Sequence, residues 1–244
     1  MMLEAFAWGV FAAGSLVVGA VMALVLPISQ RALGLIMAFG SGVLISAVAY
    51  ELVEEASTTT DSNWVISIGL AAGALTFFVG DNLIDRFAGA DRRHSRDTDD
   101  ESGSASAIVL GTVLDGIPES AVIGLTLVGG GSIGAAVVAA VFISNIPEAI
   151  AGTSGLYKRG WKRSRLLLMW SAIALVSGVA AMTGFAFGDS ASPEALAFVL
   201  AFAGGALLTM LADSMIPDAF KLGGNAAGLF TTFGFGLAFA LTAL

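Results

Sequence analysis

The stretch DGIPES at residues 115–120 has a near copy in SNIPEA at residues 144–149. Each copy places a proline and a glutamate in the middle of a long apolar run, where neither residue is expected in a soluble protein. Inside a membrane span, an ionisable residue is rare and marks a site for an ion, a proton or a substrate. The two stretches therefore indicate that the chain folds in a membrane and that its functional site lies at these residues.

Long apolar runs fill the rest of the chain as well. Of its 244 residues, 57% are hydrophobic and 12% are charged, and the mean hydropathy is +0.88. Each run is close to the ~20 residues that a helix needs to cross a bilayer. The sequence therefore predicts an all-α integral membrane protein with one transmembrane domain over residues 1–244. Its eight predicted spans are 5–26, 33–50, 64–84, 107–127, 132–155, 166–188, 195–215 and 222–243.

Charge and cysteine usage exclude several classes of protein. The net charge is −8 and the basic residues lie between the spans, so we expect no nucleic-acid partner. Cysteine is absent, which excludes disulfides and thiolate metal ligands. The first basic residue, Arg31, follows the first apolar run, so that run lacks the basic start of a signal peptide and is interpreted as a true span.

The basic residues also predict the orientation. All eleven lie in odd-numbered connections between spans, whereas the even-numbered connections carry acidic residues or no charge. Basic connections stay on the cytoplasmic side, so both termini are expected outside, and we expect the protein in the plasma membrane. The basic residues are Arg31, Arg86, Arg92, Arg93, Arg96, Lys158, Arg159, Lys162, Arg163, Arg165 and Lys221, and the acids that follow the second span are Glu51, Glu54, Glu55 and Asp61.

One connection is long. Residues 86–106 are mixed in charge and almost free of large apolar side chains, which predicts a mobile cytoplasmic loop between the third and fourth spans. His94, the only histidine of the chain, lies there among arginines. We interpret it as a solvated residue, with metal capture by the loop's acids left open as the alternative.

The second and seventh predicted spans resemble each other. Shifted by 163 positions, GVLISAVAYELVEEA from Gly42 aligns with GALLTMLADSMIPDA from Gly205. By the predicted topology the two spans run in opposite directions, which is typical of inverted-repeat transporters with a binding site near the membrane midplane. We predict that spans 1–3 are repeated in spans 6–8, around spans four and five. The matched pairs are Phe39/Phe202, Gly42/Gly205, Leu44/Leu207, Ala49/Ala212 and Ala56/Ala219, with Glu55 over Asp218.

Polar side chains share a helix face in each of spans four and five. Asp115 and Glu119 are four positions apart, as are Ser144 and Glu148. Residues at this spacing are neighbours on a helix surface. Asn145 lies beside the second pair. Counted from the span ends, all five fall in the inner half or near the centre of the bilayer.

The two prolines add backbone oxygens to these faces. Pro118 cannot bond the carbonyl of Leu114, and Pro147 cannot bond the carbonyl of Ile143. A freed carbonyl within a membrane is tolerated where it lines a cavity or a site. Prolines alone would be ordinary kinks, but here each is followed by a glutamate.

Buried carboxylates are costly in this solvent. One at the centre of a membrane helix costs about 2.5 to 3.5 kcal/mol. Every Lys and Arg lies outside the predicted spans, so neutralisation requires protonation or a mobile cation. Protonated acids that hold helices together are the alternative, especially for the acid near the cytoplasmic end of the seventh span. The carboxylates are Asp115, Glu119, Glu148 and Asp213.

The available ligands are hard oxygen donors. Carboxylate, amide, hydroxyl and peptide oxygens favour Mg²⁺, Ca²⁺ or Mn²⁺, whereas Zn²⁺ normally recruits His or Cys. The thioethers of Met210 and Met215 are interpreted as packing groups.

With eight spans, an outside N-terminus, a cytoplasmic loop after the third span and Pro-Glu motifs in spans four and five, the whole chain resembles the ZIP family of divalent-metal transporters. The family motifs resemble HNxPEG in both spans. Asp115 and Ser144 stand where that motif has its histidine, whereas Pro118-Glu119 and Pro147-Glu148 are kept. The sixth span lacks the carboxylate found in family members with two metals.

The resemblance implies a function and a site. Asp115, Glu119, Asn145 and Glu148 would line the metal site, with Ser144 as a weaker ligand. A divalent ion, Zn, Fe or Mn, would be the substrate and move toward the cytoplasm as one helix bundle slides or rocks against another. The resemblance also implies a homodimer, and we expect no permanently bound cofactor.

Two alternatives to transport remain open to a chain of this composition. A degenerate relative could bind metal or protons without transporting them. A membrane aspartyl protease would resemble YD with GxGD, but Phe78-Val79-Gly80-Asp81 lacks the first glycine and no Tyr precedes an Asp. A serine version requires a membrane histidine, so we expect no enzymatic function.

Overall fold

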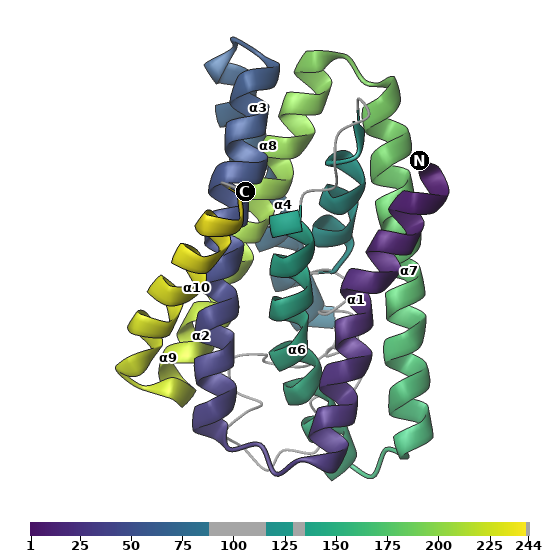
Figure 1. Cartoon of the computed structure of the whole chain (residues 1–244), viewed down its shortest axis with the longest axis vertical. Coiled ribbons are helices and arrows are strands. Elements are labelled where there is room, and N and C mark those ends of the chain that lie inside the picture. The colour runs from purple at the N-terminus through teal and green to yellow at the C-terminus, as the bar shows by residue number, and fades with distance from the viewer. Residues whose placement is uncertain (88–115, 129–134, 243–244) are drawn as a thin grey trace.

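The computed structural model describes residues 1–87, 116–128 and 135–242, and regular structure within these ranges is entirely helical. The helices pack as an elongated bundle with α6 in its middle (Figure 1). The elements are α1 (Met2–Val25), α2 (Gln30–Ala47), η1 (Val48–Val53), α3 (Glu54–Thr59), α4 (Asn63–Phe87), α6 (Ala135–Lys158), α7 (Arg163–Ser190), α8 (Pro193–Met210), η3 (Leu211–Met215), α9 (Ile216–Gly223) and α10 (Ala226–Thr242), with a short helix at Gly116–Leu125.

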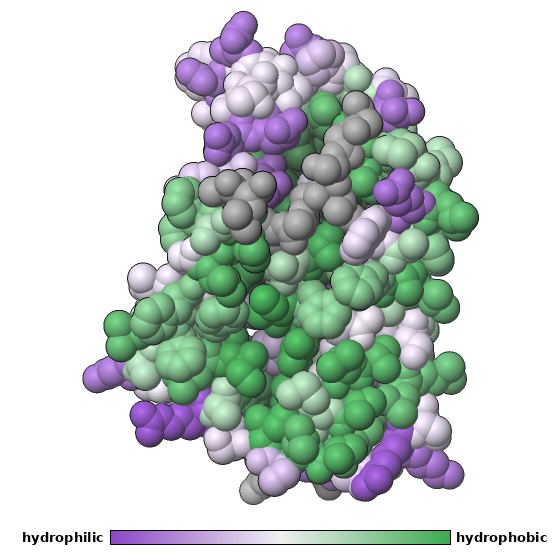
Figure 2. Space-filling model, viewed as in Figure 1, coloured by the Kyte–Doolittle hydropathy of each residue, from purple (hydrophilic) through white to green (hydrophobic). Residues whose placement is uncertain are grey.

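Length and composition of these helices fit a membrane protein. Within the described residues, six helices are long and apolar enough to cross a bilayer, and two shorter apolar helices cover Gly116–Leu125 and Ala226–Leu241. Apolar residues cover the middle of the molecule, with hydrophilic residues toward both ends (Figure 2). The predicted all-α integral membrane fold is therefore confirmed. The eight-span count stays a prediction, because much of the fourth span lies outside the described residues. The predicted loop at 86–106 begins later than expected, since α4 continues to Phe87, and the rest of that loop lies outside the described residues.

The second and seventh predicted spans are longer than expected. The second helix runs from Gln30 to Thr59 and the seventh from Pro193 to Gly223, against predictions of 33–50 and 195–215. Acidic residues misled the prediction, because Glu51 and its neighbours lie within the helix and do not end it. Helix α10, predicted as the eighth span from residue 222, begins at Ala226, four residues later. Gly224, with a φ of 66°, ends α9 and separates it from α10.

Helices α2 and α8 have the same N-terminal cap and the same π-helical segment at positions matched by the shift of 163. Each begins at a serine that accepts a hydrogen bond from a backbone N–H three residues on, Ser29 at 3.2 Å and Ser192 at 3.3 Å. Each then turns into a π-helix, at Val48 and at Leu211 respectively. Both pairs are separated by 163 positions, the shift found in the sequence. The two helices run in opposite directions across the bundle (Figure 1).

Glycines at matched positions bring two helix pairs into backbone contact. A Cβ on Gly42 of α2 would overlap the carbonyl oxygen of Thr231 on α10, and a Cβ on Gly205 of α8 would overlap that of Leu70 on α4. The α10 and α4 helices also contribute glycines, Gly234 against the Phe39 carbonyl and Gly73 against the Phe202 carbonyl. Small residues allow such close crossings in membranes. Helix α2 therefore pairs with α10 in the way that α8 pairs with α4.

Close contacts at glycines also join a second group of helices. Gly9 of α1 packs against the Ser177 carbonyl of α7, and Gly19 of α1 packs against the Ile146 carbonyl of α6. Gly184 of α7 packs against the backbone of Ala121 in the short helix. This group therefore contains α1, α6, α7 and Gly116–Leu125, the two Pro-Glu helices included.

Candidate metal-binding site

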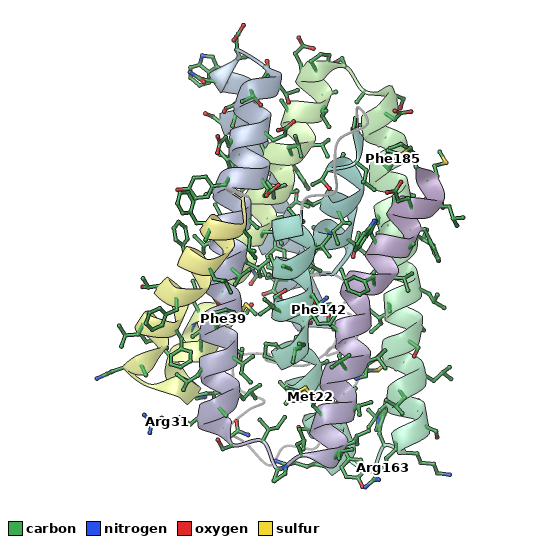
Figure 3. All side chains as sticks on the ribbon, in the orientation of Figure 1. Met22, Arg31, Phe39, Phe142, Arg163 and Phe185 are labelled. Carbon is green, nitrogen blue, oxygen red and sulfur yellow. The ribbon has the colours of Figure 1, made fainter. Side chains whose placement is uncertain are left out.

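The candidate site lies near the middle of the bundle. Phe142 of α6, two residues before Ser144, lies at about half height in Figure 3, level with Phe39 of α2. Arg31 and Arg163 both lie toward the same end of the molecule, on opposite sides of it and well away from that level (Figure 3). The second Pro-Glu motif is therefore held away from both polar ends.

Ser144 faces helix α2. Its side chain is 3% exposed, and its hydroxyl donates a 3.1 Å hydrogen bond to the Val141 carbonyl. A Cβ on Gly40 would lie 3.4 Å from the Ser144 Cα and 3.5 Å from the Met215 Cε. These are ordinary van der Waals distances. Ser144, Gly40 and Met215 therefore meet where α6, α2 and η3 come together.

The other polar residues of α6 lie beside this contact. Asn145 is 3% exposed and Glu148 is half-buried. Glu148 follows Ser144 by four residues in an unbroken helix, so both side chains occupy one face. The helix contains Pro147, which has no N–H to donate to the Ile143 carbonyl. This part of α6 therefore offers carboxylate, amide, hydroxyl and carbonyl oxygens.

The first Pro-Glu motif is buried as well. Glu119 is 3% exposed and Ser120 is 1% exposed within Gly116–Leu125. Val122 and Ile123, one turn beyond Glu119, belong to the large apolar core that also contains residues of α2, α6 and α8. Glu119 therefore lies on the core-facing side of its helix. Asp115, the remaining predicted ligand of this motif, lies outside the described residues.

Cations are kept at the surface. Every Lys and Arg whose burial is described has an exposed side chain, whereas Glu119 is 3% exposed. Among the described residues no group of three or more His, Cys, Asp or Glu side chains could by itself hold a metal. The exposed cations are Arg31, Lys158, Arg159, Lys162, Arg163, Arg165 and Lys221.

Asp213 is placed differently from the other predicted ligands. It lies with Ala212 and Ser214 on the exposed side of η3, whereas Leu211 and Met215 are buried. Of the two thioethers interpreted as packing groups, Met210 is 5% and Met215 is 8% exposed. The carboxylate is thus turned away from the contact that Met215 makes at Gly40.

Two residues near the site carried no ligand signal in the sequence. Gly40 was one of many glycines, and only the packing reveals that it faces Ser144. Ser120, the last residue of the first motif, was not predicted as a ligand, yet it is among the most buried polar residues. Its position directly after the Pro-Glu pair was the one available signal.

Comparison with known proteins adds one relative. No family model matches the chain. A protein of Arabidopsis thaliana named a putative zinc transporter is 29% identical over 192 residues, which cover 77% of this chain. The chain spans about 30% of the length of that relative. The similarity supports the resemblance found in the sequence, and the long apolar helices fit a protein embedded in a membrane.

Proposed function

We propose that this protein carries divalent metal ions across a membrane, toward the cytoplasm, through a site between the two Pro-Glu helices. The proposed substrates are Zn²⁺, Fe²⁺ and Mn²⁺, bound transiently, with no permanent cofactor and no enzymatic step. The relative's name supports the substrate class. The ligands would be Asp115, Glu119, Asn145 and Glu148, with Ser144 as a weaker partner.

The observation that carries the proposal is the burial of Glu119. A carboxylate 3% exposed in a membrane bundle is expensive unless a positive charge compensates it. All described Lys and Arg side chains are exposed, mostly at helix ends and in turns, where they face water or headgroups. A mobile cation that binds and leaves would supply this compensation, and a proton would do so between transport events.

The ligand types set the expected preference among ions. Carboxylate and amide oxygens bind hard divalent cations, and the motif histidines that favour zinc are replaced at Asp115 and Ser144. Mn²⁺ and Fe²⁺ should therefore be carried at least as well as Zn²⁺. Asp213, on an exposed face, would act at most on the approach of the ion.

A movement between two helix groups would open the site to either side. The matched Ser29/Ser192 caps, π-helices and glycine crossings support an inverted repeat in which α2–α10 and α8–α4 form one group. The Pro-Glu helices belong to the other group, with α1 and α7. Alternating access in inverted-repeat transporters is largely a rigid-body movement of one such group against the other.

We also propose a span count, an orientation in the membrane and an oligomeric state. The chain would form one transmembrane domain of eight spans in the plasma membrane, with both termini outside and residues 86–106 as a cytoplasmic loop. It would act as a homodimer. The concentration of described basic side chains at the α6–α7 turn supports this orientation.

Metal uptake by liposomes containing the purified protein tests the proposal. Mn²⁺ uptake, followed with an entrapped fluorescent chelator, should fall at least tenfold in Glu119→Gln and in Glu148→Gln, because each removes a charged ligand from the path. Glu4→Gln, at an exposed position in the first turn of α1, is the matched control and should transport normally. Normal uptake by both buried-site variants would rule out this site.

A second candidate function is metal or proton binding without transport. The replacement of both motif histidines favours it, since a relative that lost its ligands could keep the fold and serve as a sensor. Calorimetry would then find saturable Mn²⁺ or Zn²⁺ binding that Glu119→Gln weakens. Liposomes containing the same preparation would take up none of the ions tried.

A further inference from the structure

The turn between α6 and α7 has a defined geometry. Gly160 adopts a φ of 85°, which favours glycine, and its N–H donates to the Tyr157 carbonyl at 3.0 Å. The Trp161 N–H donates to the Leu156 carbonyl at 3.1 Å. These two bonds form a Schellman motif, which ends α6 and fixes the path of the chain into α7.

This turn is the most basic described part of the chain. Five of the eight residues from Lys158 to Arg165 are Lys or Arg, and all five are exposed. No Asp or Glu occurs between Glu148 and Asp189, so no acid of α6, α7 or their turn lies near these cations in sequence. The turn therefore presents concentrated positive charge to its surroundings.

Two of the arginines are held by aromatic rings. The Arg165 Cζ lies 3.9 Å from the centroid of the Trp161 ring, and the Arg163 Cζ lies 5.8 Å from that of Tyr157. A guanidinium on an aromatic face is attracted by the ring and keeps its N–H donors at its edge. Those donors match the oxygens of a phosphate group. The stacking thus orients two phosphate-binding groups before any ligand arrives.

The position of the turn indicates that a phosphate group bound there would belong to a membrane lipid. The turn joins two helices of membrane-spanning length, and Arg163 lies at the end of the molecule where Arg31 also lies (Figure 3). Tyr157 is exposed and Trp161 is partly exposed, and Trp and Tyr at such an end occupy the headgroup level of a bilayer. Leu168, one turn into α7, is 72% exposed and presents apolar surface for an acyl chain. The basic residues therefore lie where the headgroup of a phospholipid would be, and Leu168 lies farther along α7, where its acyl chain would be.

We propose that the turn at residues 157–165 binds the phosphate headgroup of an anionic phospholipid, with the acyl chains along α7 at Leu168. Arg163 and Arg165 bind the phosphate oxygens, and Lys158 and Lys162 attract the net negative charge. The site is separate from the carboxylate site and does not depend on metal transport.

Lipid titration of the full chain in neutral detergent tests this site. Because the chain has no cysteine, Ser164→Cys gives a single position for an environment-sensitive fluorophore. Phosphatidylglycerol should saturate the signal at a concentration at least tenfold lower than phosphatidylcholine of the same acyl chains. In the Arg163→Gln/Arg165→Gln background the affinity should fall about 25-fold, since each basic residue near a membrane surface contributes about fivefold.

Three controls separate the proposal from simpler explanations. Arg31→Gln removes an exposed cation from the same end and should leave the lipid preference unchanged. Arg165→Lys keeps the charge but loses the planar stack, so its affinity should lie between wild type and Arg165→Gln. Equal affinity for the two lipids, an unchanged preference in the double variant, or the same saturating signal from 10 mM inorganic phosphate would overturn the proposal.

Discussion

Helix α2 meets two of its neighbours, α10 and α6, in different ways. Toward α10, Gly42 leaves no space for a Cβ, because the carbonyl oxygen of Thr231 lies where that atom would be. Toward α6 and η3, a Cβ on Gly40 would lie 3.4 Å from the Ser144 Cα and 3.5 Å from the Met215 Cε, which are normal contact distances. Two glycines two positions apart thus differ in spacing: at Gly42 an added Cβ would overlap backbone, whereas at Gly40 it would make ordinary van der Waals contacts.

This difference separates a fixed contact from a movable one. In the α2–α10 crossing, and in its counterpart between α8 and α4, backbone meets backbone and little can shift without loss of packing. At the α2–α6 contact, van der Waals spacing next to buried polar groups allows another arrangement at lower cost. The contact beside Ser144 is therefore the one suited to change in the transport cycle that we propose.

The largest expected effect is at the tight crossing. Gly42→Ala should lower the thermal midpoint in detergent by about 5 °C or more, because the new Cβ overlaps a backbone carbonyl and forces the helices apart. Gly14→Ala is the matched control, since a Cβ there has no neighbour within 4 Å and the midpoint should not fall. Equal behaviour of the two variants would remove the distinction between the crossing and other helix positions.

A smaller loss of stability is expected within the group that carries the site. The Trp170 indole N–H donates to the Thr153 hydroxyl at 2.8 Å, and both side chains are fully buried. Thr153→Val leaves this donor without an acceptor and should cost about 1–2 kcal/mol, measured as a lower unfolding midpoint. Thr232→Val is the control, because its exposed hydroxyl bonds only to the Gly228 carbonyl of its own helix. A Thr153 variant as stable as the control would contradict the importance of the α6–α7 bond.

The smallest effect on stability is expected at the α2–α6 contact. Gly40→Ala should leave the midpoint within about 1 °C of wild type, because its Cβ meets neighbours at normal distances. Metal uptake should nevertheless fall several-fold, since the methyl group fills space beside Ser144. Liposome uptake and thermal melts of one preparation measure both quantities. A large drop in midpoint with unchanged uptake would show this face to be as fixed as the crossing with α10.

The buried polar residues and the internal repeat were predictable from residue types. Asn145 and Glu119 were predicted to lie together in the membrane interior, and both are almost fully buried. The match of Gly42 with Gly205 indicated a repeat, and the packing gives both glycines the same kind of contact. These features are predictable because a carboxylate, a proline or a glycine in an apolar helix has few other roles.

Helix ends and helix faces were less predictable. Glu51 was taken to lie beyond the second span, but the helix continues past it through a π-turn to Thr59. Asp213 was grouped with the buried acids, but it lies on an exposed face. A helix that is apolar on every side has no periodicity to show which face meets protein and which meets lipid.

The sequence by itself determined that this chain is a helical membrane protein with carboxylates at two proline-marked positions, because hydropathy and the cost of buried charge act residue by residue. Only the tertiary structure decided that Gly40, not Gly42, faces Ser144, that α2 pairs with α10 as α8 pairs with α4, and that Asp213 turns away. Those outcomes depend on how helices rotate and cross, and in lipid that is set by side-chain fit between distant segments.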